Sequence, residues 1–141
     1  MNNSLSIVFG EPEHGWLPVD LHYNDFHLAF DASDVINDPI EELYNAVTKL
    51  CDNDIRRVTW YLEPGGIFFD FEKQGQSITL TILETEDLHR KVDENKQLII
   101  ITQNKKEVIK PFRTALWHFS SKTYEEIHWP YRLDNNSIKD L

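Results

Sequence analysis

The chain has 141 residues, enough for one domain, and its 40% hydrophobic content argues against intrinsic disorder. Its net charge of −10 disfavours nucleic acid and anionic lipid as partners, because like charges repel. The single cysteine, Cys51, excludes an internal disulfide, and no apolar run approaches the roughly 20 residues of a membrane-spanning helix.

Alternating apolar residues predict three strands in the first third of the chain. The first covers residues 4–9, and the other two are the arms of a hairpin within residues 17–30. An Asn-Asp pair at 24–25 tolerates the positive φ of a tight turn. The register set by that turn places His22 directly opposite His27, on the face away from the apolar residues.

A helix is expected to follow at Asp38, which is a good N-cap. Pro39 suits the first helical position, and Glu41 completes a capping-box pattern. The apolar residues then recur at spacings of three and four, as on a helix face that packs against a core. These residues are Ile40, Leu43, Tyr44, Val47, Leu50 and Cys51. Their pattern predicts that Cys51 is a buried, inert thiol.

The middle of the chain predicts an antiparallel meander. Residues 56–63 and 67–73 flank a Pro-Gly-Gly turn. Pairing Trp60 with Phe69 makes one face of this hairpin wholly apolar, and the same register places Arg57 opposite an acidic residue.

Two further strands, over residues 76–83 and 97–102, are expected to complete a four-strand meander. The leucine and isoleucine run of the last strand predicts a position covered on both faces. A second helix is expected over residues 107–121, and Pro111 should lie within its first turn. Residues 134–141 form a polar tail that we expect to be loose.

The order of these elements predicts an α+β fold. Its sheet would be mainly antiparallel, formed by the hairpin and the four-strand meander, with two helices packed on one face. Residues 1–141 are expected to form a single domain. The initial residues have neither a basic region nor a long apolar stretch, so we expect no secretion signal and a cytoplasmic protein.

No nucleotide-binding, zinc-protease, paired-cysteine or serine-hydrolase motif occurs in the sequence. We therefore predict no catalytic residue, no metal and no cofactor, and a protein that is not an enzyme. Three residues on one face of the first hairpin, Asp20, His22 and His27, have the chemistry of metal ligands. A solvated strand face is the interpretation that we favour for them.

A second histidine group lies near the end of the chain. His118 and His128 flank Glu125, and a histidine–carboxylate pair can act as acid and base. Nothing in their spacing brings these side chains together, so a structural or surface role is the favoured interpretation.

The four tryptophans differ in setting. Trp60 fits the core face of the meander, and Trp117 lies off the main stripe of the second helix, where partial exposure is expected. Trp16 and Trp129 stand beside proline-containing loops. Each could anchor a protein interface or seal an edge of the core.

The distribution of charge predicts the kind of partner. Residues 1–55 hold eleven acidic residues against one basic residue, Lys49, whereas residues 56–141 hold thirteen of each sign. A negative surface attracts basic proteins, although the same charge can serve solubility alone. The predicted partner-binding residues are the acidic side chains of this segment with one tryptophan as anchor: Glu11, Glu13, Trp16, Asp20, Asp25, Asp31, Asp34, Asp38, Glu41 and Glu42.

Three segments, HGWLPV at 14–19, LEPGG at 62–66 and PFRTAL at 111–116, are similar to stretches of small bacterial proteins. In size, acidity and lack of catalytic motifs, the chain resembles bacterial immunity proteins of contact-dependent inhibition and related toxin systems. The resemblance implies a cytosolic protein that binds a cognate toxin domain, often a nuclease, and blocks it. It assigns no individual residue a role, because immunity proteins share no common signature.

Two other hypotheses remain open. The chain could be a small enzyme or ligand-binding domain with a pocket between sheet and helices, lined by aromatic residues and histidines. It could also be a structural or oligomer-forming module that makes contact through an exposed strand edge.

Overall fold

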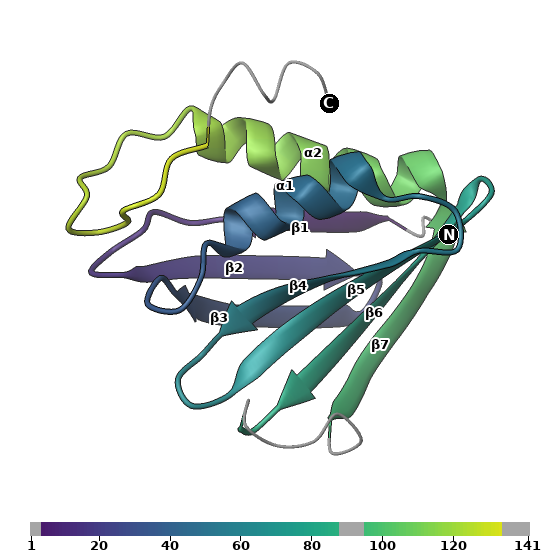
Figure 1. Cartoon of the computed structure of the whole chain (residues 1–141), viewed down its shortest axis with the longest axis horizontal. Helices are drawn as coiled ribbons and strands as arrows, with labels where there is room; N and C mark the ends of the chain where they lie inside the picture. The colour runs from purple at the N-terminus through teal and green to yellow at the C-terminus, as the bar shows by residue number, and fades with distance from the viewer. Residues whose placement is uncertain (1–3, 88–94, 134–141) are drawn as a thin grey trace.

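Seven strands and two helices make up the part of the chain described by the computed structural model, residues 4–87 and 95–133 (Figure 1). One sheet has the order β1 (Leu5–Phe9), β2 (Trp16–Tyr23), β3 (Phe26–Ser33), and the other has the order β4 (Ile55–Tyr61), β5 (Gly66–Gln74), β6 (Ser77–Thr85), β7 (Lys96–Asn104). Both sheets are antiparallel. The helices are α1 (Pro39–Lys49) and α2 (Lys105–Ser120). This arrangement confirms the predicted α+β fold. The predicted tail at 134–141 lies outside the described residues.

The first hairpin has the predicted register. His22 pairs with His27 and Leu21 with Leu28 across a turn in which Asn24 has a φ of 52°. β1 pairs antiparallel with β2 and becomes an edge strand. The strict alternation of buried and exposed residues along β1 shows that only one face of this sheet meets the core.

Helix α1 begins as predicted and ends early. The Asp38 carboxylate accepts a hydrogen bond from the backbone N–H of Glu41 at 3.3 Å, which is the expected cap. Leu50 already has an extended backbone, with φ −71° and ψ 122°. Because the helical spacing stops there, Cys51 leaves the buried stripe and is exposed. The prediction of a buried thiol is therefore wrong.

The meander has the predicted faces with a register shifted by two residues. Trp60 pairs with Ile67, not with Phe69. The cause is the position of the loop: residues 62–65 form it, one residue earlier than the residues 63–66 that the predicted pairing leaves between the strands. A hydrogen bond of 2.8 Å from the N–H of the first loop residue to the carbonyl of the last closes it. Side chains alternate with a period of two, so a shift of two keeps every apolar residue on the core face. The next turn is formed by residues 75–76, so that Gln74 pairs with Ser77 and Phe71 with Leu80.

β7 and α2 correct two further expectations. β7 is an edge strand with one covered face: Ile101 is buried, whereas Ile100 is 51% exposed. The prediction failed because a run of aliphatic residues does not show which face is covered, and the helices cover only one face of the sheet. Helix α2 starts at Lys105 and continues through Pro111, which is beyond its first turn. Burial of Phe112 and its neighbours on the same face outweighs the local cost of an interior proline, about 3 kcal/mol.

Aromatic side chains connect the two sheets with α2. Trp60 is fully buried, as predicted, and its ring contacts Phe30 of β3 at 5.7 Å, Phe9 of β1 at 6.0 Å and Phe69 of β5 at 5.3 Å. Phe69 in turn meets Phe112 of α2 at 6.2 Å. One buried cluster therefore spans both sheets and the helix.

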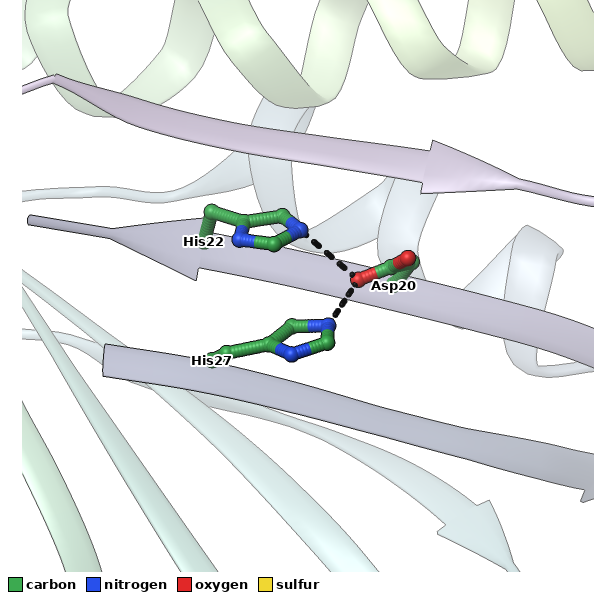
Figure 2. A group of neighbouring side chains, drawn as sticks. All are labelled: Asp20, His22 and His27. Atoms are coloured by element: carbon green, nitrogen blue, oxygen red, sulfur yellow. Dashed lines mark hydrogen bonds and ion pairs between the residues drawn. The ribbon is translucent and has the colours of Figure 1, made fainter. Parts of the chain in front are cut away.

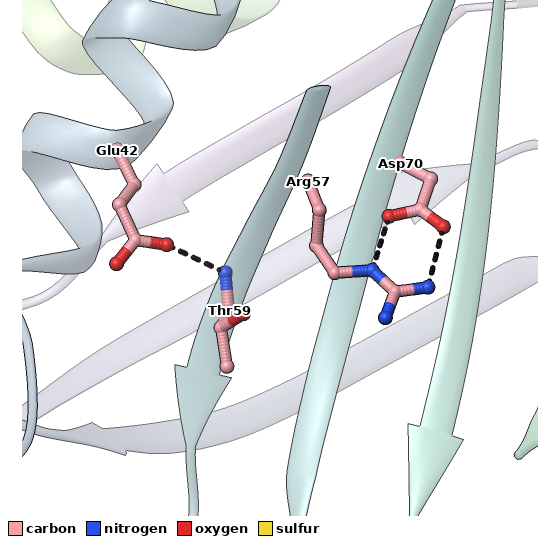
Figure 3. A network of polar contacts seen from close by, with 4 residues as sticks. All are labelled: Glu42, Arg57, Thr59 and Asp70. Atoms are coloured by element: carbon pink, nitrogen blue, oxygen red, sulfur yellow. Dashed lines mark hydrogen bonds and ion pairs between the residues drawn. The ribbon is translucent and has the colours of Figure 1, made fainter. Parts of the chain in front are cut away.

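Helix α1 covers the outer edge of β4. One carboxylate oxygen of Glu42 accepts the backbone N–H of Thr59 at 2.9 Å (Figure 3). The amide of Asn37 donates to the Thr59 carbonyl at 2.9 Å and to the other Glu42 oxygen. These side chains satisfy backbone groups that an edge strand would otherwise present to another strand. On the other side of β4, Arg57 holds Asp70 through two hydrogen bonds of 2.8 and 2.9 Å. The sequence predicted that Arg57 lies opposite an acidic residue, and in the observed register that residue is Asp70.

The exposed thiol can be tested directly. Ellman's reagent should titrate the thiol of Cys51 in native buffer at a rate close to that of the unfolded chain, because Cys51 is exposed in the folded protein. A thiol that stays silent until urea is added would contradict the early end of α1.

The contact between α1 and β4 predicts a difference between two adjacent glutamates. Glu42→Ala should lower the free energy of unfolding by about 2 kcal/mol, because it leaves the Thr59 N–H without its acceptor. Glu41→Ala, a matched loss of charge from the same helical turn on its exposed side, should change it by less than about 0.5 kcal/mol. Urea unfolding monitored by tryptophan fluorescence measures the free energy of unfolding of both variants. An equal decrease in the two would disprove the stabilising role of the Glu42–Thr59 hydrogen bond.

Candidate functional site

Three segments distant in sequence are tied together where β2 begins and β3 ends, at the left of Figure 1. Gly15 accepts the backbone N–H of Asp34 at 2.9 Å and donates its own N–H to the carbonyl of His128 at 2.8 Å. A side chain at Gly15 would lie 2.9 Å from the Asp34 carboxylate, and its φ of 86° also favours glycine. The hydroxyl of Tyr131 then donates to the Asp34 carbonyl at 2.6 Å.

Large apolar side chains are exposed on these tied segments. Val35 is 68% exposed and Ile36 60%, and both lie in the connection between β3 and α1. Trp16, 37% exposed, is paired with the last residue of β3, just before this connection. Apolar side chains held open on a fixed loop are typical of protein-binding surfaces.

Carboxylates surround these apolar residues. Burial raises the pKa of Asp38 to about 6, against the lowering effect of the hydrogen bond from Glu41, and the charges of Glu41 and Glu42 raise it further. Burial also raises the pKa of Asp34, and the negative charge of Glu63 adds to the effect. Burial is thus the main cause of both shifts, and neighbouring carboxylates add to it. We name this surface the acidic end, defined by Glu13, Trp16, Asp34, Val35, Ile36, Asp38, Glu41 and Glu63.

The predicted binding residues are only partly brought together. Five belong to the acidic end: Glu13, Trp16, Asp34, Asp38 and Glu41. The remaining five lie elsewhere or are engaged: Glu11 pairs with Lys122 at 2.7 Å, Asp20 contacts two histidines, Asp25 is in the turn at the opposite end of the hairpin, Asp31 is exposed on β3, and Glu42 is turned toward β4.

Sequence reasoning missed three members of the acidic end. Val35 and Ile36 look like ordinary loop residues in the sequence, and only their exposure distinguishes them. Glu63 lies beyond the acidic first segment of the chain, in the β4–β5 loop, and reaches the surface through the fold alone. The sequence placed Glu63 next to the turn between two predicted strands, but it gave no sign that this turn lies beside Asp34.

The C-terminal histidine group does not form one site. A groove of about 470 Å³ between β1 and α2 is lined by His118 with Lys110, Lys122 and other residues, but not by Glu125 or His128. Elsewhere, the Nδ1 atom of His128 accepts the backbone N–H of His14 at 3.0 Å. His128 thus has a structural contact, as the favoured interpretation expected.

Of the remaining tryptophans, Trp117 is exposed and Trp129 is buried. Trp117 is 48% exposed on α2, which confirms its expected partial exposure. Trp129 is buried and packs edge-on against Tyr131 at 5.7 Å, so it seals the core under the C-terminal segment. Trp16 is the exposed tryptophan that belongs to the acidic end.

The histidines of the first hairpin do converge. His22 and His27 stack with ring centroids 4.1 Å apart, and the Nε2 atoms of both rings lie next to one carboxylate oxygen of Asp20 (Figure 2). Among the residues that the structure describes, these three are the group with metal-ligand chemistry and spacing. All three side chains are about half-exposed, so the face is solvated as expected.

The chain matches no known protein family, no curated protein and no solved structure. Across residues 4–87 and 95–133, no helix combines the length and apolar character needed to cross a membrane.

Burial of the Asp38 carboxylate predicts an unusual pH dependence of stability. The raised pKa of Asp38 means that the folded state holds this proton more tightly than the unfolded chain, whose ordinary value is 3.8. Its contribution to stability is complete below that value and is lost as the pH rises through about 6. An asparagine at this position would cap equally well without a charge. The substitution Asp38→Asn should therefore gain about 1 kcal/mol relative to the wild type between pH 4 and pH 7, a value reduced for partial solvation.

Urea unfolding of both proteins across this pH range gives the difference directly. A stability difference that stays constant with pH would show that Asp38 carries no extra proton affinity in the folded state.

Proposed function

We propose that this protein is a binding module for a basic protein partner, and that the acidic end is its contact surface. The observation that carries the proposal is the exposed Val35–Ile36 pair, with Asp34 and Asp38 on either side of it and Trp16 nearby. Protein interfaces combine a few apolar or aromatic anchors with a polar rim, and anchors near the centre supply most of the binding energy.

The connection that presents the apolar pair is held in place before any partner arrives. The N–H of Asp34 is bonded to Gly15 and its carbonyl to Tyr131, and the N–H of Val35 donates to the Ser33 hydroxyl at 3.1 Å. A fixed loop loses little conformational entropy on binding, which favours affinity. This supports a role in recognition over one as a flexible connection.

The electrostatics select the sign of the partner. Burial raises the pKa of both Asp34 and Asp38, and the negative charge of Glu63 adds to the effect at Asp34, as that of Glu41 does at Asp38. A lysine or arginine from a partner would relieve this repulsion, whereas an anionic surface would increase it. Charges of this kind mainly accelerate association, to as much as about 10⁸ M⁻¹s⁻¹ at low salt.

The specific form of the proposal is an immunity protein that neutralises a basic toxin domain, such as a nuclease. Its support is the resemblance in size, acidity and absence of catalytic motifs, together with the surface described above. A nuclease binds an anionic substrate and so presents basic groups, and a rigid acidic surface is complementary to such groups.

The alternative is a small ligand-binding domain, and the groove between β1 and α2 favours it. Lys110 and His118 would suit an anionic ligand there, whereas Lys122 is already paired with Glu11 and Glu107 adds a negative charge to the lining. The groove contains no pair of groups arranged for acid–base chemistry among its described lining residues, so binding is a better supported role than catalysis.

The test begins with affinity capture from the native host and with the products of the neighbouring reading frames. A basic partner should be recovered, and its association rate should fall as salt is raised. With the purified partner, Val35→Ser/Ile36→Ser should raise the dissociation rate at least about tenfold. Glu13→Gln/Glu63→Gln should instead lower mainly the association rate.

Matched controls lie elsewhere on the surface. Val8→Ser removes an exposed valine from β1, and Asp25→Asn removes a carboxylate from the opposite end of the hairpin. Both should leave the kinetics unchanged. If binding survives the changes at the acidic end and is lost with Lys110→Ala, the groove is the functional site and the proposal is wrong.

A further inference from the structure

The strand register brings two histidine side chains unusually close. The backbone N–H of Gly10 donates to the Pro18 carbonyl, so the even-numbered residues of β2 bond to β1 and its odd-numbered residues bond to β3. His22 and His27 are therefore a non-hydrogen-bonded pair between β2 and β3. At such positions the Cα atoms are only about 4.5 Å apart, which explains the close stacking of the rings.

Asp20 completes the group from the same face. It lies two residues before His22 on β2 and diagonally opposite His27 on β3. Its Oδ1 atom is 3.1 Å from Nε2 of His22 and 2.6 Å from Nε2 of His27. The rings are nearly parallel, at 7°, and both direct the same nitrogen toward this oxygen (Figure 2). Three ligand atoms thus surround one point.

We propose that Asp20, His22 and His27 form a binding site for a late first-row divalent metal ion such as zinc. Zinc binds imidazole nitrogen and carboxylate oxygen at about 2.0–2.2 Å, so tetrahedral ligand atoms lie about 3.3 Å apart. The separation of 3.1 Å already fits this geometry. The separation of 2.6 Å needs a small opening, which half-exposed side chains can make by rotation.

The ligand set selects the metal. Two imidazoles and one carboxylate suit zinc, copper, nickel or cobalt, whereas magnesium and calcium prefer oxygen ligands. Binding replaces the proton on each Nε2, and the neutral imidazole can carry its proton on Nδ1 instead. The proposal replaces the sequence-based prediction of no metal.

The surroundings leave the site accessible. Residues that share this sheet face with the three ligands include Ser6 opposite His22, and Val8 and Ala29 on the two sides of Asp20. All three of these neighbours are exposed, so the face around the ligands is open to solvent. With three protein ligands, a fourth position remains for water, so the site is open in the manner of zinc sites with an exchangeable ligand.

The experiment is calorimetric titration of the whole protein with zinc chloride, supported by the visible absorption of bound cobalt(II). The wild type should bind one zinc ion per chain and should not bind magnesium. His22→Ala and His27→Ala should each weaken zinc binding at least about tenfold, since even residues that only orient a ligand cost about 10–100-fold. Asp20→Asn, which keeps the side-chain shape, should weaken it as well.

The matched control is His118→Ala, which removes an exposed histidine from α2 and should leave the affinity for zinc unchanged. Zinc should raise the melting temperature of the wild type and of this control, but not that of the His22→Ala/His27→Ala variant. Circular dichroism checks that each variant is folded. The absence of binding by the wild type, or equal affinity in the hairpin variants, would overturn the site.

Discussion

Aromatic packing around Trp60 is the interaction on which the rest of the structure depends. β3 and β4 belong to different sheets, so no backbone ladder between them holds the two halves together in the described part of the chain. Phe9 and Phe30 from one sheet and Phe69 from the other meet the Trp60 ring. Aromatic pairs of this kind each contribute about 0.5–1.5 kcal/mol beyond the burial of their area. Side-chain packing therefore holds the two sheets together, whereas backbone hydrogen bonds hold the strands together within each sheet.

The acidic end follows from that packing. Because the sheets are fixed against each other, the loop after β3, the start of α1 and the β4–β5 loop lie at one end of the molecule (Figure 1). The same constraint turns Glu42 toward β4, whereas Glu41 one position earlier faces solvent. The histidine group on the first hairpin does not depend on the packing between the sheets. It needs only the two-residue turn of the first hairpin and the register that follows from it.

The sequence predicted local features well. The cap at Asp38, the Asn-Asp turn and the apolar faces of every hairpin depend on residues that are close in the chain, so their chemistry is visible in the pattern. Predictions failed where a loop or a neighbour decides the outcome. The four-residue loop at 62–65 shifted a register, and the packing of α2 carried the helix through Pro111.

For function, the sequence by itself determined the composition of the surface: its net charge, the location of that charge in the first 55 residues and the pairing of His22 with His27. Only the tertiary structure decided which carboxylates meet, which are neutralised within the chain, and that Val35 and Ile36 remain exposed among them. The reason is physical. Periodicity and turn chemistry act over a few residues, whereas a surface is formed by segments that packing brings together from across the chain.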